Sequence, residues 1–358
     1  MPIRKMFCVA ALLAGTACTT VRAEPEVQAM RNPQMIEQLA ACFDAQRAAA
    51  SFNGVVLVRT PEGDVFRRAV GYSDAEGRVP MTADTRFRVA SVTKVITRTA
   101  IARLADEGRI SLDAPIGTYV PGLPDPMAKV TVDQLIHHSS GIVNLTYLED
   151  GNPDFEVLMN ARRATDILPL LVRHPLEFAP GKRRVYSNGG FDMLGVVVEA
   201  VTGKTYAAHV EEAIFRPLGM RDSSFVPEGR MAVPMTTWDM KDATRPQPAP
   251  YFDRVGRPSG SSIHTADDLL KLGQALMGDT FLSRPVKERT LEMDYGGVGQ
   301  FGGTAGTSTA FMTFGTGLNL IVLANYDPPV GELMSMALWG VTKGEPCKPK
   351  APPPALAG

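Results

Sequence analysis

The sequence predicts an α/β (α+β) protein whose antiparallel sheet is built from both chain ends, is flanked by helices and carries an inserted, mainly helical lobe. Two observations predict this class. Strand-like runs separated by turn residues lie near each end of the chain, at residues 53–72 and 309–325. Between them, residues 110–258 combine helical periodicity with loops rich in Pro and Gly. A sheet assembled from both ends needs helices to cover its faces.

The first elements follow from local signals. Asn32-Pro33 predicts the N-cap and first turn of a helix that runs to about residue 49. Strands are expected at 53–60 and 64–72 around a turn at 61–64. An extended segment at 85–90 leads into a long helix at 91–107, which Gly108 closes.

The later elements follow in the same way. Strands at 309–314 and 318–325 form a hairpin through the turn at 315–317. Helices are expected at 130–138, 191–202, 206–215, 265–277 and 330–342. The predicted organisation is a signal peptide at 1–23, an α/β sandwich at 30–95 and 260–343, a helical lobe at 96–259 and a disordered tail at 344–358. Five prolines in residues 345–358 indicate that disorder.

Residues 1–23 have the features of an export signal. A positive start precedes an apolar stretch at 6–17 that is too short to span a bilayer, and residues 21–23 fit a signal-peptidase site. The mature chain is expected to begin near Glu24 and to be periplasmic or secreted, with lipidation at Cys18 the less favoured reading. No later segment has the length of a transmembrane span.

Composition excludes several function classes. The 358 residues are 44% apolar and 21% charged, as in an ordinary globular protein, and are long enough to bury a core. A net charge of -1 offers no basic excess for nucleic acid. Adjacent histidines at 137 and 138 form a poor chelate, so no metal is expected, and no glycine pattern indicates a nucleotide or other cofactor. His264 is interpreted as part of the turn and cap before a helix.

Two cysteines, Cys42 and Cys347, remain after signal removal. In an oxidising compartment this pair is consistent with a disulfide. Two unrelated thiols, one in a helix and one in the tail, are the alternative.

The segment Ser91-Val92-Thr93-Lys94 is the first candidate for catalysis. Positions i and i+3 share a helix face, so the hydroxyl and the amine face the same space. A serine needs a nearby base, and a lysine can serve only when neutral, which requires about 4–5 kcal/mol of destabilisation of its charged form. The alternative is an N-cap serine beside an exposed lysine. Of the eleven lysines, Lys94 alone has Ser three residues before it.

Tyr186-Ser187-Asn188 is the second candidate. In extended backbone the side chains at i and i+2 point the same way, so the phenol and the amide would face one pocket. Tyr186 could relay the serine proton, and Asn188 could bind Lys94 and a substrate carbonyl. The alternative is a loop with an ordinary turn asparagine.

Residues 86–94, Arg-Phe-Arg-Val-Ala-Ser-Val-Thr-Lys, resemble the nucleophile segment of class C β-lactamases, family VIII esterases and their penicillin-binding-protein-like relatives. Other segments are similar to that family in matching order: residues 112–115, 119–121, 138–141, 178–181 and 217–220. The resemblance covers about residues 33–343. It implies the α/β sandwich with an inserted helical lobe and an active site between them.

The family's third motif is altered here. Relatives carry Lys-Thr-Gly or His-x-Gly on the strand that lines the site, whereas this chain has Gln300-Phe301-Gly302-Gly303. A neutral amide at Gln300 cannot attract a substrate carboxylate. The resemblance implies that Gly302 and Gly303 line the substrate, with the N–H groups of Ser91 and Gly303 as the oxyanion hole. Glycine permits close backbone approach there.

These residues predict a serine hydrolase that forms an acyl-enzyme with a small ester, lactone or amide and needs no cofactor. Ser91 attacks, while Lys94 and Tyr186 handle the proton. The substrate is a small molecule or short peptide. The alternatives are a D-amino-acid peptidase, carboxypeptidase or β-lactamase, and a catalytically impaired binding module. The loss of the strand cation at Gln300 disfavours substrates that are recognised through a carboxylate.

Overall fold

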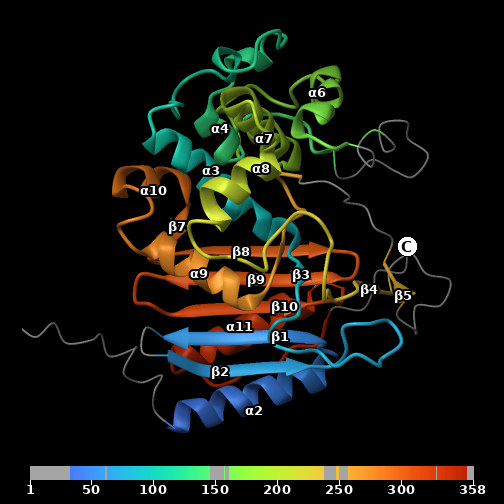
Figure 1. The fold of residues 1–358 in the computed structure, drawn as a ribbon. Coiled ribbons are helices and arrows are strands. Elements are labelled where there is room, and N and C mark those ends of the chain that lie inside the picture. Colours follow the sequence, from blue (N-terminus) through green and yellow to red (C-terminus); the bar gives the residue numbers. More distant parts are fainter. Residues whose placement is uncertain are drawn as a thin grey trace, which may run out of the picture.

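The computed structural model describes residues 33–60, 63–145, 157, 161–237, 247–249, 257–327 and 329–352 (Figure 1). The predicted signal peptide, the expected start near Glu24 and the helix cap at Asn32 lie outside these residues. Within the described ranges, no helix combines the length and the apolar character that crossing a membrane requires.

An antiparallel sheet of six strands has the order β2-β1-β10-β9-β8-β7. Strands from the two chain ends meet at its centre, where Val56 pairs with Val322. The predicted sheet from both ends is therefore confirmed, and β7 and β8 extend it beyond the expected C-terminal hairpin. The strands are β1 Gly54–Thr60, β2 Gly63–Val70, β7 Met293–Asp294, β8 Gly297–Thr304, β9 Thr307–Phe314 and β10 Asn319–Ala324.

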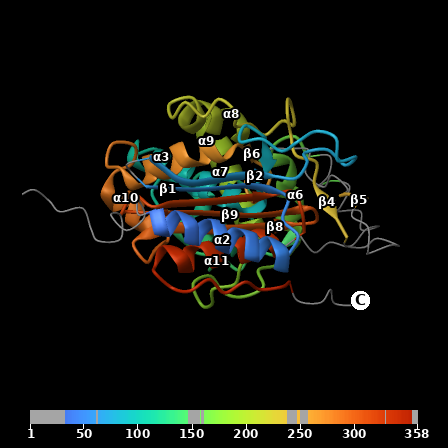
Figure 2. The same cartoon turned by 90° about the horizontal axis from the view of Figure 1, so that it is seen from below.

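Helices cover both faces of the sheet, as Figure 2 shows from below. α2 (Pro33–Ala49) and α11 (Val330–Thr342) lie on one face, and α9 (Ala266–Met277) lies on the other. Val56 and Val322 pack toward α2 and α11, whereas Val55 and Leu323 join the core on the opposite side. This alternation explains why β1 and β10 are continuous apolar runs: each of their two faces is buried.

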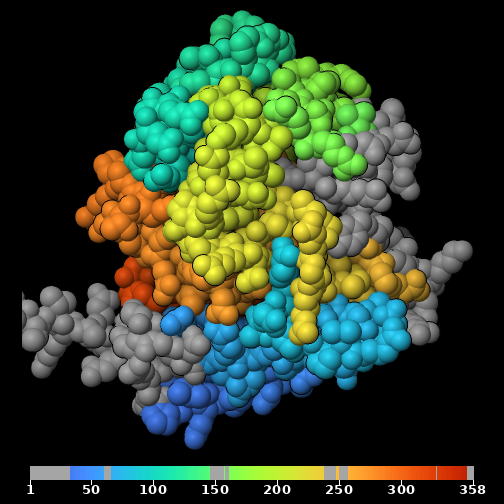
Figure 3. All heavy atoms as spheres, in the orientation of Figure 1, coloured from blue at the N-terminus to red at the C-terminus, as the bar shows by residue number. Residues whose placement is uncertain are grey.

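Most of the remaining helices lie beyond the β8 edge of the sheet (Figure 1). They are α3 Thr93–Asp106, α4 Val132–Ile136, α6 Ala164–Arg173, α7 Asn188–Thr202 and α8 Tyr206–Val210, with a π-helical turn at Glu211–Phe215. α10 (Arg284–Thr290) packs on α3 from the C-terminal part. On the face shown in Figure 3 the helical segments sit directly on the α9 region, where Lys271 Nζ donates to the Gly219 carbonyl at 2.7 Å.

Short elements connect these parts. They are the 3₁₀ turns η1 Ala90–Val92, η2 Ile116–Thr118 and η3 Met127–Lys129, and the paired short strands β3 Phe87–Arg88 with β6 Ile263–His264 and β4 Met235–Thr236 with β5 Gln247–Pro248. The β3–β6 pair ties the segment before Ser91 to the segment before α9.

Several expected boundaries shift for local reasons. Ser91 lies in the 3₁₀ turn η1 rather than at the start of the α-helix. α4 covers only five residues, and it begins at a capping box made by Thr131 and Gln134. α7 begins at Asn188 because the Ser187 hydroxyl accepts the Gly190 N–H. Helices α6 and α10 were not expected, because Pro169 inside α6 weakens a sequence-based helix signal and α10 is only seven residues long.

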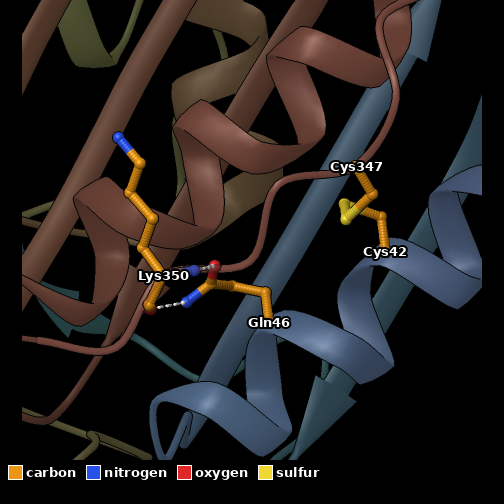
Figure 4. The surroundings of a disulfide bond; sticks show 4 residues. All are labelled: Cys42, Gln46, Cys347 and Lys350. Carbon is orange, nitrogen blue, oxygen red and sulfur yellow. Dashed lines mark hydrogen bonds between the residues drawn. A yellow bond between two sulfur atoms is a disulfide. The ribbon is translucent and has the colours of Figure 1, made fainter.

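The C-terminal tail is held against α2 (Figure 4). Cys42 and Cys347 form a disulfide with 5.5 Å between their Cα atoms. Gln46 makes two hydrogen bonds to the backbone of Lys350, at 2.8 and 2.9 Å. The expectation of disorder from residue 344 onward is therefore wrong as far as residue 352, because these contacts fix a segment whose composition alone indicates flexibility. Residues 353–358 lie outside the described part.

Candidate active site

Ser91 lies on a turn that two other parts of the chain hold in place. The preceding residue, Ala90, has a φ of 44°, a left-handed conformation that surrounding contacts must stabilise in a residue other than glycine. The Val89 carbonyl accepts a hydrogen bond from the buried Thr309 hydroxyl at 2.9 Å, and the Val89 N–H donates to Ser262. These contacts fix the backbone that positions the Ser91 hydroxyl.

Lys94 is fully buried and reaches the Ser91 hydroxyl. Its Nζ atom lies 3.1 Å from Ser91 Oγ, 2.6 Å from Asn188 Oδ1 and 2.6 Å from the Ser259 carbonyl oxygen. An ammonium group has three N–H donors, so these three acceptors match the charged form of lysine. The arrangement favours a cationic Lys94, whereas a lysine acting as the base itself would have to be neutral.

Tyr186 donates a hydrogen bond to Ser91 Oγ at 2.8 Å. Lys94 Nζ lies 4.8 Å from the centre of the Tyr186 ring. The structure brings the sequence-predicted Ser91, Lys94, Tyr186 and Asn188 together, although Asn188 opens a helix rather than continuing an extended strand. Its amide is oriented from the other side by Asn144, whose Oδ1 accepts from Asn188 Nδ2 at 3.2 Å.

Strand β8 lines the opposite side of Ser91. Thr304 and Thr307 close its hairpin with β9, so the even-numbered residues of β8 exchange backbone hydrogen bonds with β9. The backbone N–H and C=O groups of the odd-numbered residues point to the other edge of β8. Near Gly297 this edge pairs with β7, and farther along the strand it packs against the turn that carries Ser91. The N–H of Gly303 is therefore presented on the edge next to Ser91, as an oxyanion hole requires.

Gly302 brings β8 close to the Ser91 turn. A Cβ at this position would lie 2.2 Å from the Val89 carbonyl oxygen and 3.1 Å from the Ser91 nitrogen. Only glycine therefore fits. Gln300, two residues earlier, is neutral, and its Nε2 donates to the Phe301 carbonyl at 2.8 Å. This amide supplies no positive charge to the site.

His138 is a residue whose role the sequence did not reveal. Its backbone carbonyl accepts from the Val185 N–H at 2.9 Å, and its Nδ1 accepts from the Ser187 N–H at 3.2 Å. Its ring also stacks on Tyr186, with 4.7 Å between ring centres. Burial, together with the nearby Arg98 and Lys94 cations, lowers the pKa of His138 to about 3. The neutral imidazole thus holds Ser187, and the His138 backbone carbonyl holds Val185, on either side of Tyr186.

The segment before α9 also differs from expectation. The Ser259 carbonyl comes from this segment, and no side-chain signal identifies a backbone acceptor. His264 is buried in β6 and bonded to Ser223 Oγ at 2.8 Å, whereas Thr265 is the cap of α9. Among the described residues, no group of three or more His, Cys, Asp or Glu side chains is arranged to hold a metal ion.

Comparisons with known proteins agree with the fold. The family model described as Beta-lactamase matches residues 39–342. Esterase EstB of Burkholderia gladioli is 32% identical over 322 residues, which cover 78% of this chain and 80% of that protein. A penicillin-binding protein from Bacillus halodurans superposes with a TM-score of 0.71 at 26% identity, covering 84% of this chain and 97% of that one. The D-amino acid amidase from Ochrobactrum anthropi SV3 shares the fold, with a TM-score of 0.70 at 22% identity and coverage of 86% and 96%.

Proposed function

Because the chain belongs to the beta-lactamase family, we propose that it is a serine hydrolase that works through an acyl-enzyme on Ser91. The observation that carries the proposal is the double contact on one hydroxyl. Tyr186 Oη and Lys94 Nζ lie 2.8 and 3.1 Å from Ser91 Oγ. A nucleophile within hydrogen-bond distance of its base, with that base oriented by a third group, is the arrangement that covalent catalysis uses.

In the proposed acylation, Ser91 Oγ bonds to the substrate carbonyl carbon while Tyr186, as tyrosinate, takes the serine proton. The cationic Lys94 stabilises the tyrosinate, and the Ser259 carbonyl and Asn188 hold that ammonium in place. Collapse of the intermediate breaks the bond to the leaving group, which receives the proton from Tyr186. Water then repeats the sequence on the acyl-enzyme and releases the acid and Ser91.

The negative oxygen of each tetrahedral intermediate would lie between the N–H groups of Ser91 and Gly303. Donors aimed at a developing oxyanion contribute about 3–4 kcal/mol each to the rate. Ser91 lies in the first turn of the helical segment η1–α3, so the helix dipole favours the same negative charge. The close approach of β8 at Gly302 supports this two-donor arrangement.

We propose a short, neutral carboxylic ester or lactone as the preferred substrate. The neutral Gln300 supports this choice, because no cation on β8 is available to bind a carboxylate. The 32% sequence identity to an esterase, over 78% of this chain, supports the choice as well. We further propose that the protein acts after export and removal of residues 1–23, with no cofactor.

Hydrolysis of p-nitrophenyl butyrate by the purified protein and by Ser91→Ala tests the proposal. Loss of the nucleophile should reduce kcat by about 10⁵-fold or more. Equal turnover by both proteins would exclude Ser91 as the nucleophile. D-phenylalanine amide and a chromogenic cephalosporin, assayed beside the ester, separate an esterase from an amidase and a β-lactamase. Labelling of Ser91 without turnover would instead indicate an acylation-only binding module.

A further inference from the structure

A buried charge cluster lies one helical turn beyond Lys94. Arg98 follows Lys94 by four residues on α3, so the two share a helix face, and its side chain is only 2% exposed. Glu292, from the loop before β7, forms an ion pair with Arg98 and a second ion pair with Arg184. We call Arg98, Glu292 and Arg184 the arginine cluster. Two guanidinium groups share one carboxylate, so the cluster carries one net positive charge.

The arginine cluster adjoins the proposed proton-transfer site. The Phe191 ring contacts Lys94 Nζ at 5.5 Å, the Arg98 guanidinium at 5.2 Å and the His138 ring at 5.0 Å. Arg184 lies two residues before Tyr186 in the sequence. Burial is the main cause that lowers the pKa of Arg98 and Arg184 lowers it further, whereas the negative charges of Glu292 and of ionised Tyr186 raise it. The effect is reciprocal, since a positive Arg98 favours ionised Tyr186.

The charged and titratable groups around Tyr186 come from four segments. Lys94 and Arg98 face it from α3, His138 stacks on it, Arg184 lies on its own segment and Glu292 comes from the loop before β7. His138 is neutral above about pH 3 and adds no charge. Gln300 adds none from β8. Apart from Lys94, the positive charge that we identify near Tyr186 is therefore that of the arginine cluster.

We propose that Arg98 is a positioning residue whose charge, held by Glu292 and shared with Arg184, stabilises the anionic form of Tyr186 in place of the cation missing at Gln300. This inference rests on the proposed function, because it concerns the proton transfer from Ser91. It predicts opposite effects for the arginine variants and for the Glu292 variant. Removing either arginine leaves the cluster neutral, whereas removing the Glu292 charge leaves it with two positive charges.

The expected shifts of the pH profile follow from the net charge of the cluster in each variant. Arg98→Met and Arg184→Gln should move the ascending limb of kcat/KM for p-nitrophenyl butyrate to higher pH, by about half a unit to one unit. Glu292→Gln should move it to lower pH by a similar amount. Arg98→Lys retains the charge, so its ascending limb should lie at the wild-type pH. Raising the salt concentration should shrink the Arg184→Gln shift, because that side chain is 66% exposed.

Arg183→Gln is the matched control. It removes the same charge one residue away, from a guanidinium that lies over the Phe178 ring 4.7 Å from its centre. The pH profile of this variant should match that of the wild type. Arg98→Met removes a buried ion pair and could unfold the protein. In that case the exposed Arg184→Gln and the isosteric Glu292→Gln decide the direction of the pH shift. Shifts of all cluster variants in one direction, or no shift in any, would overturn the proposal.

A second readout does not depend on turnover. The tyrosinate absorbance of each variant, minus that of the same variant carrying Tyr186→Phe, isolates Tyr186 among the eight tyrosines. Its midpoint should rise in Arg184→Gln, fall in Glu292→Gln and stay unchanged in Arg183→Gln. If the wild type fails to hydrolyse the ester but the midpoints shift as stated, the proposed function fails and the charge cluster stands. If the ester is hydrolysed and the midpoints do not respond, the cluster inference fails.

Discussion

The hydroxyl oxygens of Tyr186 and Ser91 lie 2.8 Å apart although the residues are 95 positions apart in the sequence. Each is held by a different part of the fold. Ser91 stands on a turn fixed by Thr309 of β9, whereas Tyr186 lies between two backbone N–H groups that donate to His138. The contact therefore depends on the packing of the helices against the β8 edge, and loss of either anchor should loosen it.

Tyr186→Phe tests the proton relay. The change removes one hydroxyl from a side chain that is 44% exposed, so folding should be unaffected. Proton transfer by a positioned group contributes about 10²–10⁴-fold, and kcat/KM for p-nitrophenyl butyrate should fall by that factor. Tyr295→Phe, at a side chain that is 88% exposed, is the control and should retain full activity. A fall of less than about threefold in Tyr186→Phe would assign the base role to Lys94.

Gly302→Ala tests the fit of β8 to the nucleophile turn. The new methyl group would lie 2.2 Å from the Val89 carbonyl oxygen, so the strand and the Ser91 turn must separate. Loss of one oxyanion donor reduces kcat by about 10²–10³-fold, and a similar loss is expected here. Gly299→Ala is the matched control on the same strand, because its Cβ meets no atom within 4 Å. Equal activity of the two variants would show that this close contact is not needed.

Much of the fold could be predicted from local patterns. The strands around Val56 and Val322 were identified because both faces of the central sheet are buried, which leaves uninterrupted apolar runs. Strand β8 carries four glycines in eight residues and has little apolar signal, so only its resemblance to a family motif located it. The ordered tail at Cys347 could not be inferred from composition, since a covalent bond and two distant hydrogen bonds determine its path.

The side chains of the site were easier to predict than their supports. Ser91, Lys94, Tyr186 and Asn188 carry chemistry at recognisable spacings, and the structure brings them together. The Ser259 carbonyl carries no sequence signal, because every residue has one. Arg98 and Glu292 are 194 positions apart, and nothing local indicates that they pair.

Gln300→Lys tests whether the neutral amide sets substrate class. A lysine would restore a cation on β8, where a carboxylate of the substrate could pair with it. A partly exposed ion pair contributes up to about 1 kcal/mol. The ratio of kcat/KM for a chromogenic cephalosporin to that for p-nitrophenyl butyrate should therefore rise by about fivefold. Gln300→Met, uncharged and of similar length, should leave the ratio unchanged. An unchanged ratio in Gln300→Lys would mean that charge on β8 does not select the substrate.

Two buried histidines make stability depend on pH. Burial is the main cause that lowers the pKa of His138 and of His264 to about 3, below the unfolded value of about 6.5. The contribution of the neutral histidines to the free energy of unfolding is complete above about pH 6.5. It is lost as the pH falls toward 3, because the unfolded chain binds protons that the folded protein excludes. Near pH 5 the loss is about 2 kcal/mol for each histidine.

Urea unfolding at about pH 7.5 and pH 5 checks this pH dependence. The midpoint should be clearly lower at the acidic pH, and His264→Asn should reduce the difference between the two midpoints. His264 is suited to this test because its ring lies in β6, bonded to Ser223, and outside the contacts of Ser91. Equal midpoints for the wild type at both pH values would contradict the prediction.

The disulfide should affect stability without affecting catalysis. Cys42 and Cys347 close a loop of about 300 residues, and loss of such a bridge costs about 2–5 kcal/mol. The bridge joins α2 to the tail that follows α11 (Figure 4), whereas Ser91 lies in η1, which packs against β8. The Cys42→Ser, Cys347→Ser double variant should therefore have a lower Tm and, at 25 °C, the same kcat/KM. Unreduced protein that begins at Glu24 should show no titratable thiol after denaturation. Two free thiols, or a double variant that melts at the wild-type temperature, would show that the tail is held by Gln46 and packing rather than by a covalent bond.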